Sequence, residues 1–209
     1  PPFKDAERQN ATRCCRLPIR TDPVPLRLAV HRRSFPPVAR ADARVLILGS
    51  MPGEASLRAG QYYAHPRNLF WSFMGAIFEA GSDCDYAQRV HRLQAHGIAV
   101  WDVLASCERP GSLDGRIARA SEVANDFGRF FAEHPQLETV LLNGGKAAEA
   151  FARHVTTRHP ARVAQLRVIA LPSTSPANAS QPVAAKLDRW QVALADYRSP
   201  LQAHPGELR

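Results

Sequence analysis

Arg44-Val45-Leu46-Ile47-Leu48-Gly49-Ser50-Met51-Pro52-Gly53 is the stretch of sequence that decides the fold. Its apolar run, Val45 to Leu48, is continuous rather than alternating, which is typical of a parallel strand buried on both faces. The glycines, serine and proline that follow end the strand and indicate a loop at the carboxyl edge of a sheet. The stretch therefore predicts an α/β fold.

Three further apolar runs predict strands, at residues 98–104, 139–143 and 166–171. Apolar residues at helical spacing predict helices at residues 69–80 (capped by Asn68 and stopped by Gly81), 86–95, 122–131 (capped by Ser121), 147–154 and 183–194. Strands that alternate with helices require right-handed crossovers and a parallel sheet covered on both faces. We predict a three-layer α/β/α sandwich around a central four-stranded parallel sheet.

The net charge of +8 is unevenly distributed. Residues 1–40 hold nine Lys and Arg against three Asp and Glu, and seven of the 17 prolines. We therefore predict a poorly ordered Pro/Arg-rich arm at 1–28, a folded domain at 29–198 whose regular part starts near 34–37, and a tail at 199–209. The basic charge favours a polyanionic partner, although the arm is equally well interpreted as a solvated tail.

Several classes of protein are excluded by missing patterns. No apolar run approaches the length of a membrane span, and the first residues lack the apolar segment of a secretory signal. The four cysteines contain no C-x-x-C, and the eight histidines lack metal-ligand spacing. Nucleotide-binding glycine loops, the G-x-S-x-G elbow and the zinc-deaminase signature are also missing. We expect a cytoplasmic, nucleoid-associated protein that uses no metal and no cofactor.

The carboxyl ends of the predicted strands are where an open α/β sheet binds its ligand. Tyr62-Tyr63-Ala64-His65-Pro66-Arg67-Asn68-Leu69-Phe70-Trp71 places aromatic and polar side chains in a loop at this edge. Leu171-Pro172-Ser173-Thr174-Ser175-Pro176-Ala177-Asn178 adds a rigid, hydroxyl-rich loop suited to phosphate contact. An aromatic platform beside a phosphate-binding loop is typical of an enzyme that flips a base out of DNA.

These two motifs and the 49–57 segment, taken in order, resemble the hypoxanthine-DNA glycosylase branch of the uracil-DNA glycosylase superfamily over about residues 34–195. The resemblance implies a monomeric, monofunctional enzyme that excises a deaminated base from DNA. Sister branches carry a catalytic Asp or Asn where this chain has Met51, and His or Asn where it has Leu171. The usual water activator and leaving-group stabiliser are therefore missing, as they are in the hypoxanthine branch.

The predicted site residues fall into three groups on this resemblance. The catalytic residues are Asn68 and Asp102. The base-binding residues are Ser50, Met51, Tyr63, His65 and Asn143. The DNA-binding residues are Pro52, Gly53, Ser173, Thr174 and Ser175.

Each of five predicted roles has a structural alternative. Tyr63 would stack on the base or fill a gap between loop and helix, and Asn68 would bind the base edge or cap the next helix. Asp102 would read the base or pair with Arg109 or Arg116. His65 fits a loop-organising hydrogen bonder better than a general base, and Asn143 would be a turn former.

Three other functions stay open from the sequence. A uracil- or xanthine-directed glycosylase would use the same motifs. A catalytically inactive DNA-binding relative is suggested by the inert side chains of Met51 and Leu171. A nucleoside-cleaving enzyme would use the pocket without duplex DNA, and would act on free inosine.

Overall fold

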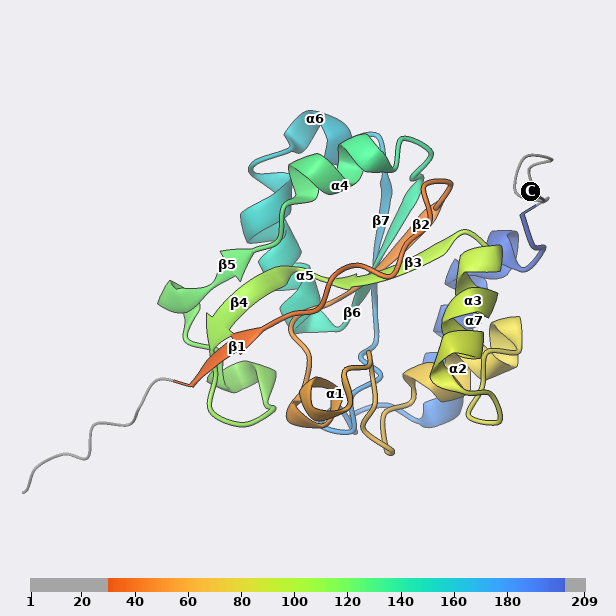
Figure 1. Ribbon diagram of the computed structural model, residues 1–209, viewed down its shortest axis with the longest axis horizontal. Helices are drawn as coiled ribbons and strands as arrows, with labels where there is room; N and C mark the ends of the chain where they lie inside the picture. Colours follow the sequence, from red (N-terminus) through yellow and green to blue (C-terminus); the bar gives the residue numbers. More distant parts are fainter. Residues whose placement is uncertain (1–29, 202–209) are drawn as a thin grey trace, which may run out of the picture.

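A computed structural model of the protein describes residues 30–201 (Figure 1). The predicted arm, 1–28, and residues 202–209 of the predicted tail lie outside the described residues. The described chain folds into three layers, with a parallel sheet between two groups of helices (Figure 1). Over this range no helix combines the length and apolar character needed to cross a membrane.

The main sheet is four-stranded and parallel, which confirms the predicted fold class. Its strands, in spatial order, are β3 (Ile98–Asp102), β2 (Val45–Gly49), β6 (Thr139–Asn143) and β7 (Arg167–Leu171). Every residue of β2 and β3 is buried, which explains why their sequences are continuously apolar. On one side of the sheet lie α2 (Phe70–Phe78), α3 (Tyr86–Ala95) and α7 (Val183–Ala193); on the other lie α4 (Phe127–Glu133), α5 (Gly145–Phe151) and α6 (Pro160–Val163) (Figure 1).

A second, antiparallel sheet was not predicted. Its strands are β1 (His31–Arg33), β4 (Leu104–Glu108) and β5 (Val123–Ala124). The predicted strand 98–104 is therefore wrong at its end: the parallel register stops at the Gly49–Asp102 pair, and the chain from Leu104 onward belongs to β4, which pairs antiparallel with β1 and β5. Regular structure also begins at His31, earlier than the predicted 34–37.

Three predicted helix boundaries are corrected by local hydrogen bonds. The helix predicted from residue 122 begins at Phe127, because the Asp126 side chain caps it by accepting from the Arg129 N–H. Val123 lies outside the helix, in β5, where it pairs with Ser106 of β4. The helix predicted to run to 80 ends at Phe78, with Glu79 in the left-handed conformation (φ 59°). The α5 helix, predicted as 147–154, begins at Gly145 and ends at Phe151, followed by a wider π turn at Ala152–Thr156.

The Ser-Pro loop at 171–178 is held from below by α7. Lys186 is 2% exposed, and its Nζ donates to the Ser173 carbonyl at 3.1 Å and to the Asn178 carbonyl. Trp190 Nε1 donates to the Pro172 carbonyl at 3.1 Å. Because these α7 side chains donate to backbone carbonyls of the loop, they fix the course of the loop and leave the loop's own side chains free for other contacts.

Replacing the buried Lys186 by Met is expected to destabilise the protein by about 1–3 kcal/mol, because two partly buried loop carbonyls lose their donor. Urea unfolding of the variant measures the effect. Arg189→Met, an exposed cation one residue before Trp190 on the same helix, is the matched control and should change stability by less than about 0.5 kcal/mol. Equal effects of the two substitutions would show that Lys186 does not hold the loop.

Candidate active site

A cavity of about 500 Å³ opens at the carboxyl ends of the parallel strands. Its walls come from the loop after β2 and the start of α1 (Glu54–Ala59), the 61–68 loop, the 112–115 loop, the turn between β6 and α5, and the Ser-Pro loop. All the predicted catalytic, base-binding and DNA-binding residues line this one cavity. The structure thus brings together residues that lie more than a hundred positions apart in the sequence.

The floor of the cavity is formed where Gly49 and Asp102 lie side by side in the parallel register of β2 and β3. A Cβ atom on residue 49 would lie 2.4 Å from Asp102 Oδ1 and 3.1 Å from the Tyr63 hydroxyl. No other residue type fits at position 49 without moving the carboxylate. The glycine that ends the strand therefore makes room for Asp102.

Asp102 is a buried carboxyl group that forms no ion pair with any basic side chain of residues 30–201. It is 3% exposed, and its Oδ2 accepts a hydrogen bond from the Ser34 hydroxyl at 3.4 Å. Burial, and secondarily the charge of Asp114, raises the pKa of Asp102 to about 7. The alternative interpretation in which Asp102 pairs with Arg109 is wrong, because Asp114 is the carboxylate in ion-pair contact with that guanidinium, at 3.7 Å.

The two tyrosines of the aromatic loop have different roles. Tyr62 is part of the core: its hydroxyl donates to the carbonyls of Phe35 and Pro36, both at 3.3 Å. Tyr63 has a left-handed backbone (φ 55°) and stacks on Phe70, with ring centroids 4.0 Å apart. The Tyr63 hydroxyl is buried without a hydrogen-bond partner among residues 30–201, and burial raises the pKa of this phenol. An unpaired buried donor at a cavity wall is a group that a ligand can satisfy.

Asn68 and His65 organise the entry to α2. Asn68 Oδ1 accepts from the Phe70 N–H at 3.0 Å, so the predicted capping contact is present, although Leu69 occupies the cap position itself. His65 Nδ1 accepts from the Arg67 N–H at 3.1 Å, which is a loop-organising contact. The Asn68 amide nitrogen remains a donor at the cavity wall.

Asn143, the last residue of β6, joins that strand to the Ser-Pro loop by two hydrogen bonds. Its Oδ1 accepts from the Thr174 N–H and its Nδ2 donates to Thr174 Oγ1, both at 2.9 Å. Thr174 is fully buried, so its hydroxyl is committed to this contact and is not exposed to DNA. Gly144 follows with φ 98°, and a Cβ there would lie 2.7 Å from Ser173 Cβ.

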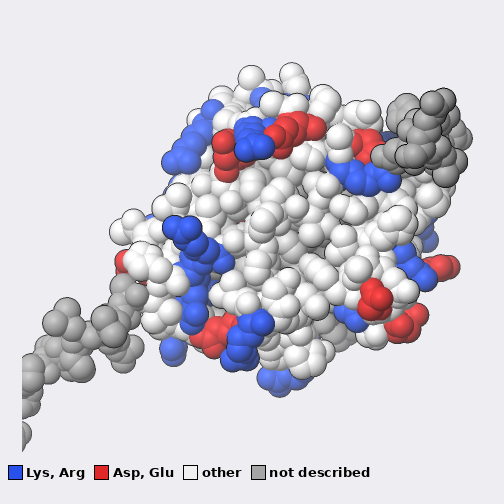
Figure 2. Space-filling view, in the orientation of Figure 1, with Lys and Arg blue, Asp and Glu red and all other residues white. Residues whose placement is uncertain are grey.

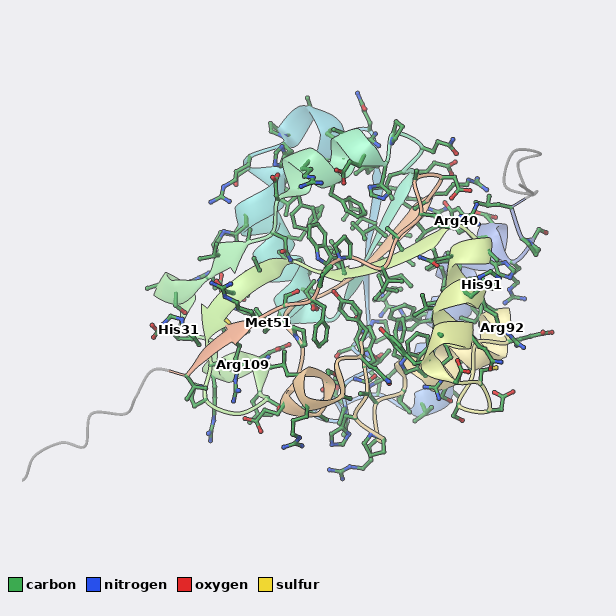
Figure 3. All side chains as sticks on the ribbon, in the orientation of Figure 1. His31, Arg40, Met51, His91, Arg92 and Arg109 are labelled. Atoms are coloured by element: carbon green, nitrogen blue, oxygen red, sulfur yellow. The ribbon has the colours of Figure 1, made fainter. Side chains whose placement is uncertain are left out.

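The sequence analysis did not predict that Arg109 shapes the 49–57 segment, the first of the three motifs along the chain. The Arg109 side chain is fully buried and donates to the carbonyls of Met51, at 3.3 Å, and of Pro52. Figure 3 shows the labelled Met51 and Arg109 next to each other. A buried arginine gives no sequence pattern, because what makes it buried is the loop that folds over it.

A second buried charge cluster lies behind the cavity wall. The Glu122 carboxylate has no exposed side-chain surface and accepts from Lys146 and Arg153, each at 2.6 Å, and from His154 at 2.8 Å. Burial alone would raise the pKa of Glu122, but the bonds from Lys146 and His154 outweigh it and lower that pKa. Lys146, which also lines the cavity, is thereby fixed in place.

No group of three or more His, Cys, Asp or Glu side chains within residues 30–201 is arranged to hold a metal ion. The residues at the cavity supply instead a buried acid, an amide, an unpaired phenol and backbone N–H groups. Such a set can hold a flat polar ring by its edge while one face lies against an aromatic side chain.

Fold and cavity together define an α/β protein with a binding pocket for a flat heterocyclic ring. The chain belongs to the uracil DNA glycosylase superfamily, whose family model matches residues 36–195. A protein of Methanosarcina barkeri (strain Fusaro / DSM 804) named hypoxanthine DNA glycosylase is 39% identical over 121 residues, covering 57% of this chain and 75% of that protein.

Two further matches come from Methanosarcina acetivorans. A protein named hypoxanthine DNA glycosylase is 39% identical over 119 residues, covering 56% of this chain and 74% of its own length. The second match is a solution NMR structure described as that of a candidate uracil DNA glycosylase. It matches with a TM-score of 0.66 at 29% identity, covering 81% of this chain and all of that one.

Replacing Asp102 by Asn is expected to stabilise the protein most at pH 8 and much less at pH 5. The folded-state pKa of about 7 lies above the ordinary value of 3.8, so stability falls as pH rises between these values and the deficit persists above pH 7. Above pH 7 this lowers the free energy of unfolding of the wild type by an amount on the order of 4 kcal/mol. Urea titrations at both pH values measure it, with the exposed Asp196→Asn as control; a difference independent of pH would contradict the assignment.

Proposed function

We propose that this protein is a monofunctional DNA glycosylase that excises hypoxanthine from deoxyinosine. The observation that carries the proposal is the single cavity in which Asp102, Asn68 and Tyr63 meet the Ser-Pro loop. Two relatives at 39% identity bear the name hypoxanthine DNA glycosylase, which supports the choice of base. A DNA substrate would place the protein at the nucleoid in the cytoplasm, and the lining of the cavity by one chain is consistent with a monomer.

Hypoxanthine is recognised in this proposal by its N1–H and O6 edge. Asp102 in its ionised form, which predominates above its pKa of about 7, accepts N1–H, and the Asn68 amide nitrogen donates to O6. Adenine presents the reverse pattern at these atoms and would leave both groups unpaired, at a cost of about 1–3 kcal/mol. Uracil has the same edge as hypoxanthine, so ring size and contact with Tyr63 must separate the two.

The base leaves with the electrons of the bond that joined it to the sugar. Donation from Asn68 to O6 strengthens as negative charge builds on the departing ring, so this contact stabilises the transition state more than the bound substrate. Ser173 and Ser175, beside the cavity mouth, are the proposed phosphate contacts that hold the flipped nucleotide. Thr174 supports them from inside the loop through Asn143.

Wild type is expected to release hypoxanthine from an inosine-containing duplex, and Asn68→Ala to lower the single-turnover rate by about 100-fold or more, the effect of losing one oxyanion-type donor. Strand cleavage by alkali after incubation measures base loss. Asn68→Asp is the matched variant, because it keeps an acceptor for the Phe70 N–H and replaces the amide donor with a negatively charged oxygen, so the rate should fall at least as far as in Asn68→Ala. Equal rates for wild type and both variants would remove Asn68 from the mechanism.

The same assay distinguishes the alternative functions. Uracil and xanthine duplexes test base preference, and free inosine tests for a nucleoside-cleaving enzyme. Binding without base release from any duplex would favour the catalytically inactive relative. Because the sequence lacks metal-ligand spacing, a chelator is expected to leave the rate unchanged.

DNA affinity is expected to fall steeply with salt, because the net charge of +8 and the serine loop favour phosphate contacts. Figure 2 shows Lys and Arg side chains along the lower edge of the molecule, where α1 lies in Figure 1. A plot of log Kd against log salt concentration measures the dependence, and a flat plot would contradict it. Removing residues 1–28 should weaken nonspecific binding and leave excision at saturating enzyme nearly unchanged.

A further inference from the structure

The cavity contains a second carboxylate, Asp114, that the motifs did not predict. Asp114 begins a short 3₁₀ turn, Asp114–Arg116, and its side chain is 45% exposed while lining the cavity. Asp102, by contrast, is 3% exposed at the floor. The two carboxylates therefore lie at different depths of one pocket.

Asp114 is fixed from two sides. The buried Arg109 guanidinium lies 3.7 Å away and is itself anchored to the Met51 carbonyl at 3.3 Å. Two residues earlier, Ser112 Oγ accepts from the Glu54 N–H at 2.9 Å and ties the 112–115 loop to the start of α1. A carboxylate held in this way keeps its position without the entropy loss that a free surface side chain would suffer on binding a substrate.

Two cations, Arg109 and Lys146, act on the charge of Asp114. Burial is the largest influence and raises the pKa of Asp114; the Ser50 hydroxyl, Arg109 and Lys146 favour the ionised form and offset part of that rise. Arg109 connects the carboxylate to the 49–57 segment, because its guanidinium lies 3.7 Å from Asp114 and also donates to the Met51 carbonyl at 3.3 Å. Asp114 and Met51 line the same cavity, so Asp114 supplies an acid beside a segment in which the side chain of Met51 supplies none.

The depth of each carboxylate in the cavity determines which part of a bound nucleotide it can contact. A flipped base enters the cavity first and reaches the floor at Asp102, while its deoxyribose stays near the mouth because the phosphate backbone holds it there. We infer that Asp114 meets the sugar, because it lines the same cavity but is 45% exposed and so lies nearer to solvent than Asp102. Cleavage of the bond between base and sugar develops positive charge on the sugar, which a fixed carboxylate stabilises.

We propose that Asp114 is a catalytic residue that stabilises the oxocarbenium-like sugar and accepts a proton from the attacking water. This inference rests on the proposed function. The N9–C1′ bond breaks and its electron pair leaves with hypoxanthine, which takes up a proton from solvent; the water oxygen bonds to C1′ and gives one proton to Asp114. Asp114 then returns that proton to solvent, so the reaction consumes one water and leaves the enzyme unchanged.

The test uses Asp114→Asn, which keeps the shape of the side chain and a hydrogen-bonding oxygen for Arg109. We expect its single-turnover rate on an inosine duplex at saturating enzyme to fall by about 100-fold or more, the usual range for a lost general base. Its Kd for the same duplex should change by less than about threefold, since the phosphate contacts remain. Asp42→Asn is the matched control: Asp42 also pairs with an arginine (Arg40, 3.0 Å), but in the turn before β2, at the opposite edge of the sheet.

A second variant separates catalysis from support of the loop. Adding Met51→Asp to Asp114→Asn returns a carboxylate to the same cavity, in the segment that Arg109 contacts, and should recover at least about tenfold of the lost rate. Wild-type activity with an equal rate for Asp114→Asn would overturn the role of Asp114 and leave the proposed function intact. A loss of rate matched by an equal loss of duplex affinity and thermal stability, with no recovery in the double variant, would also overturn it. Failure of the wild type on every duplex would instead remove the proposed function.

Discussion

The parallel register of β2 and β3 is the constraint on which the site depends. It sets Gly49 opposite Asp102, and the carboxylate occupies space that a side chain at position 49 would fill. The Tyr63 hydroxyl reaches the same point, 3.1 Å from where a Cβ of residue 49 would lie. A shift of one residue in this register would turn Asp102 to the other face of the sheet and separate the acid from the tyrosine.

Buried cations shape the loops around this floor. Arg109 binds the carbonyls of Met51 and Pro52, and Lys186 binds those of Ser173 and Asn178. Both side chains contact the loops through the backbone, so the loop side chains stay available to line the cavity. Leaving a buried charge without such partners would be costly, which makes each cation and its loop depend on each other for position.

The floor of the cavity is built at a cost to stability. Asp102 is buried beside Ser34 without a cation in contact, and the Tyr63 hydroxyl is buried unpaired among the described residues. Both features oppose folding of the empty protein. They are relieved if the ligand brings the missing hydrogen-bond partners, and the rest of the core, with β2 and β3 fully buried, supplies the stability that tolerates them.

The sequence by itself determined the fold class, the order of the parallel strands along the chain and the edge at which the motifs meet. Continuous apolar runs ended by glycine and proline require a buried parallel sheet, and its carboxyl ends must share one edge. The antiparallel sheet was not predictable, because its short strands β1 and β5 are recognised only by what they pair with. The start of α4 depended in the same way on Val123 joining β5.

Tertiary structure alone decided the roles of single side chains. The sequence predicts Thr174 as a DNA contact and Asn143 as a base contact or turn former, whereas in the fold their side chains bind each other. Arg109 and Asp114 belong to no motif that the sequence shows. Their roles in the site depend on the fold, which buries Arg109 completely and leaves Asp114 about half-exposed. The physical reason is that spacing along a chain determines local conformation, whereas the burial, partners and charge state of a side chain depend on segments that arrive from elsewhere in the sequence.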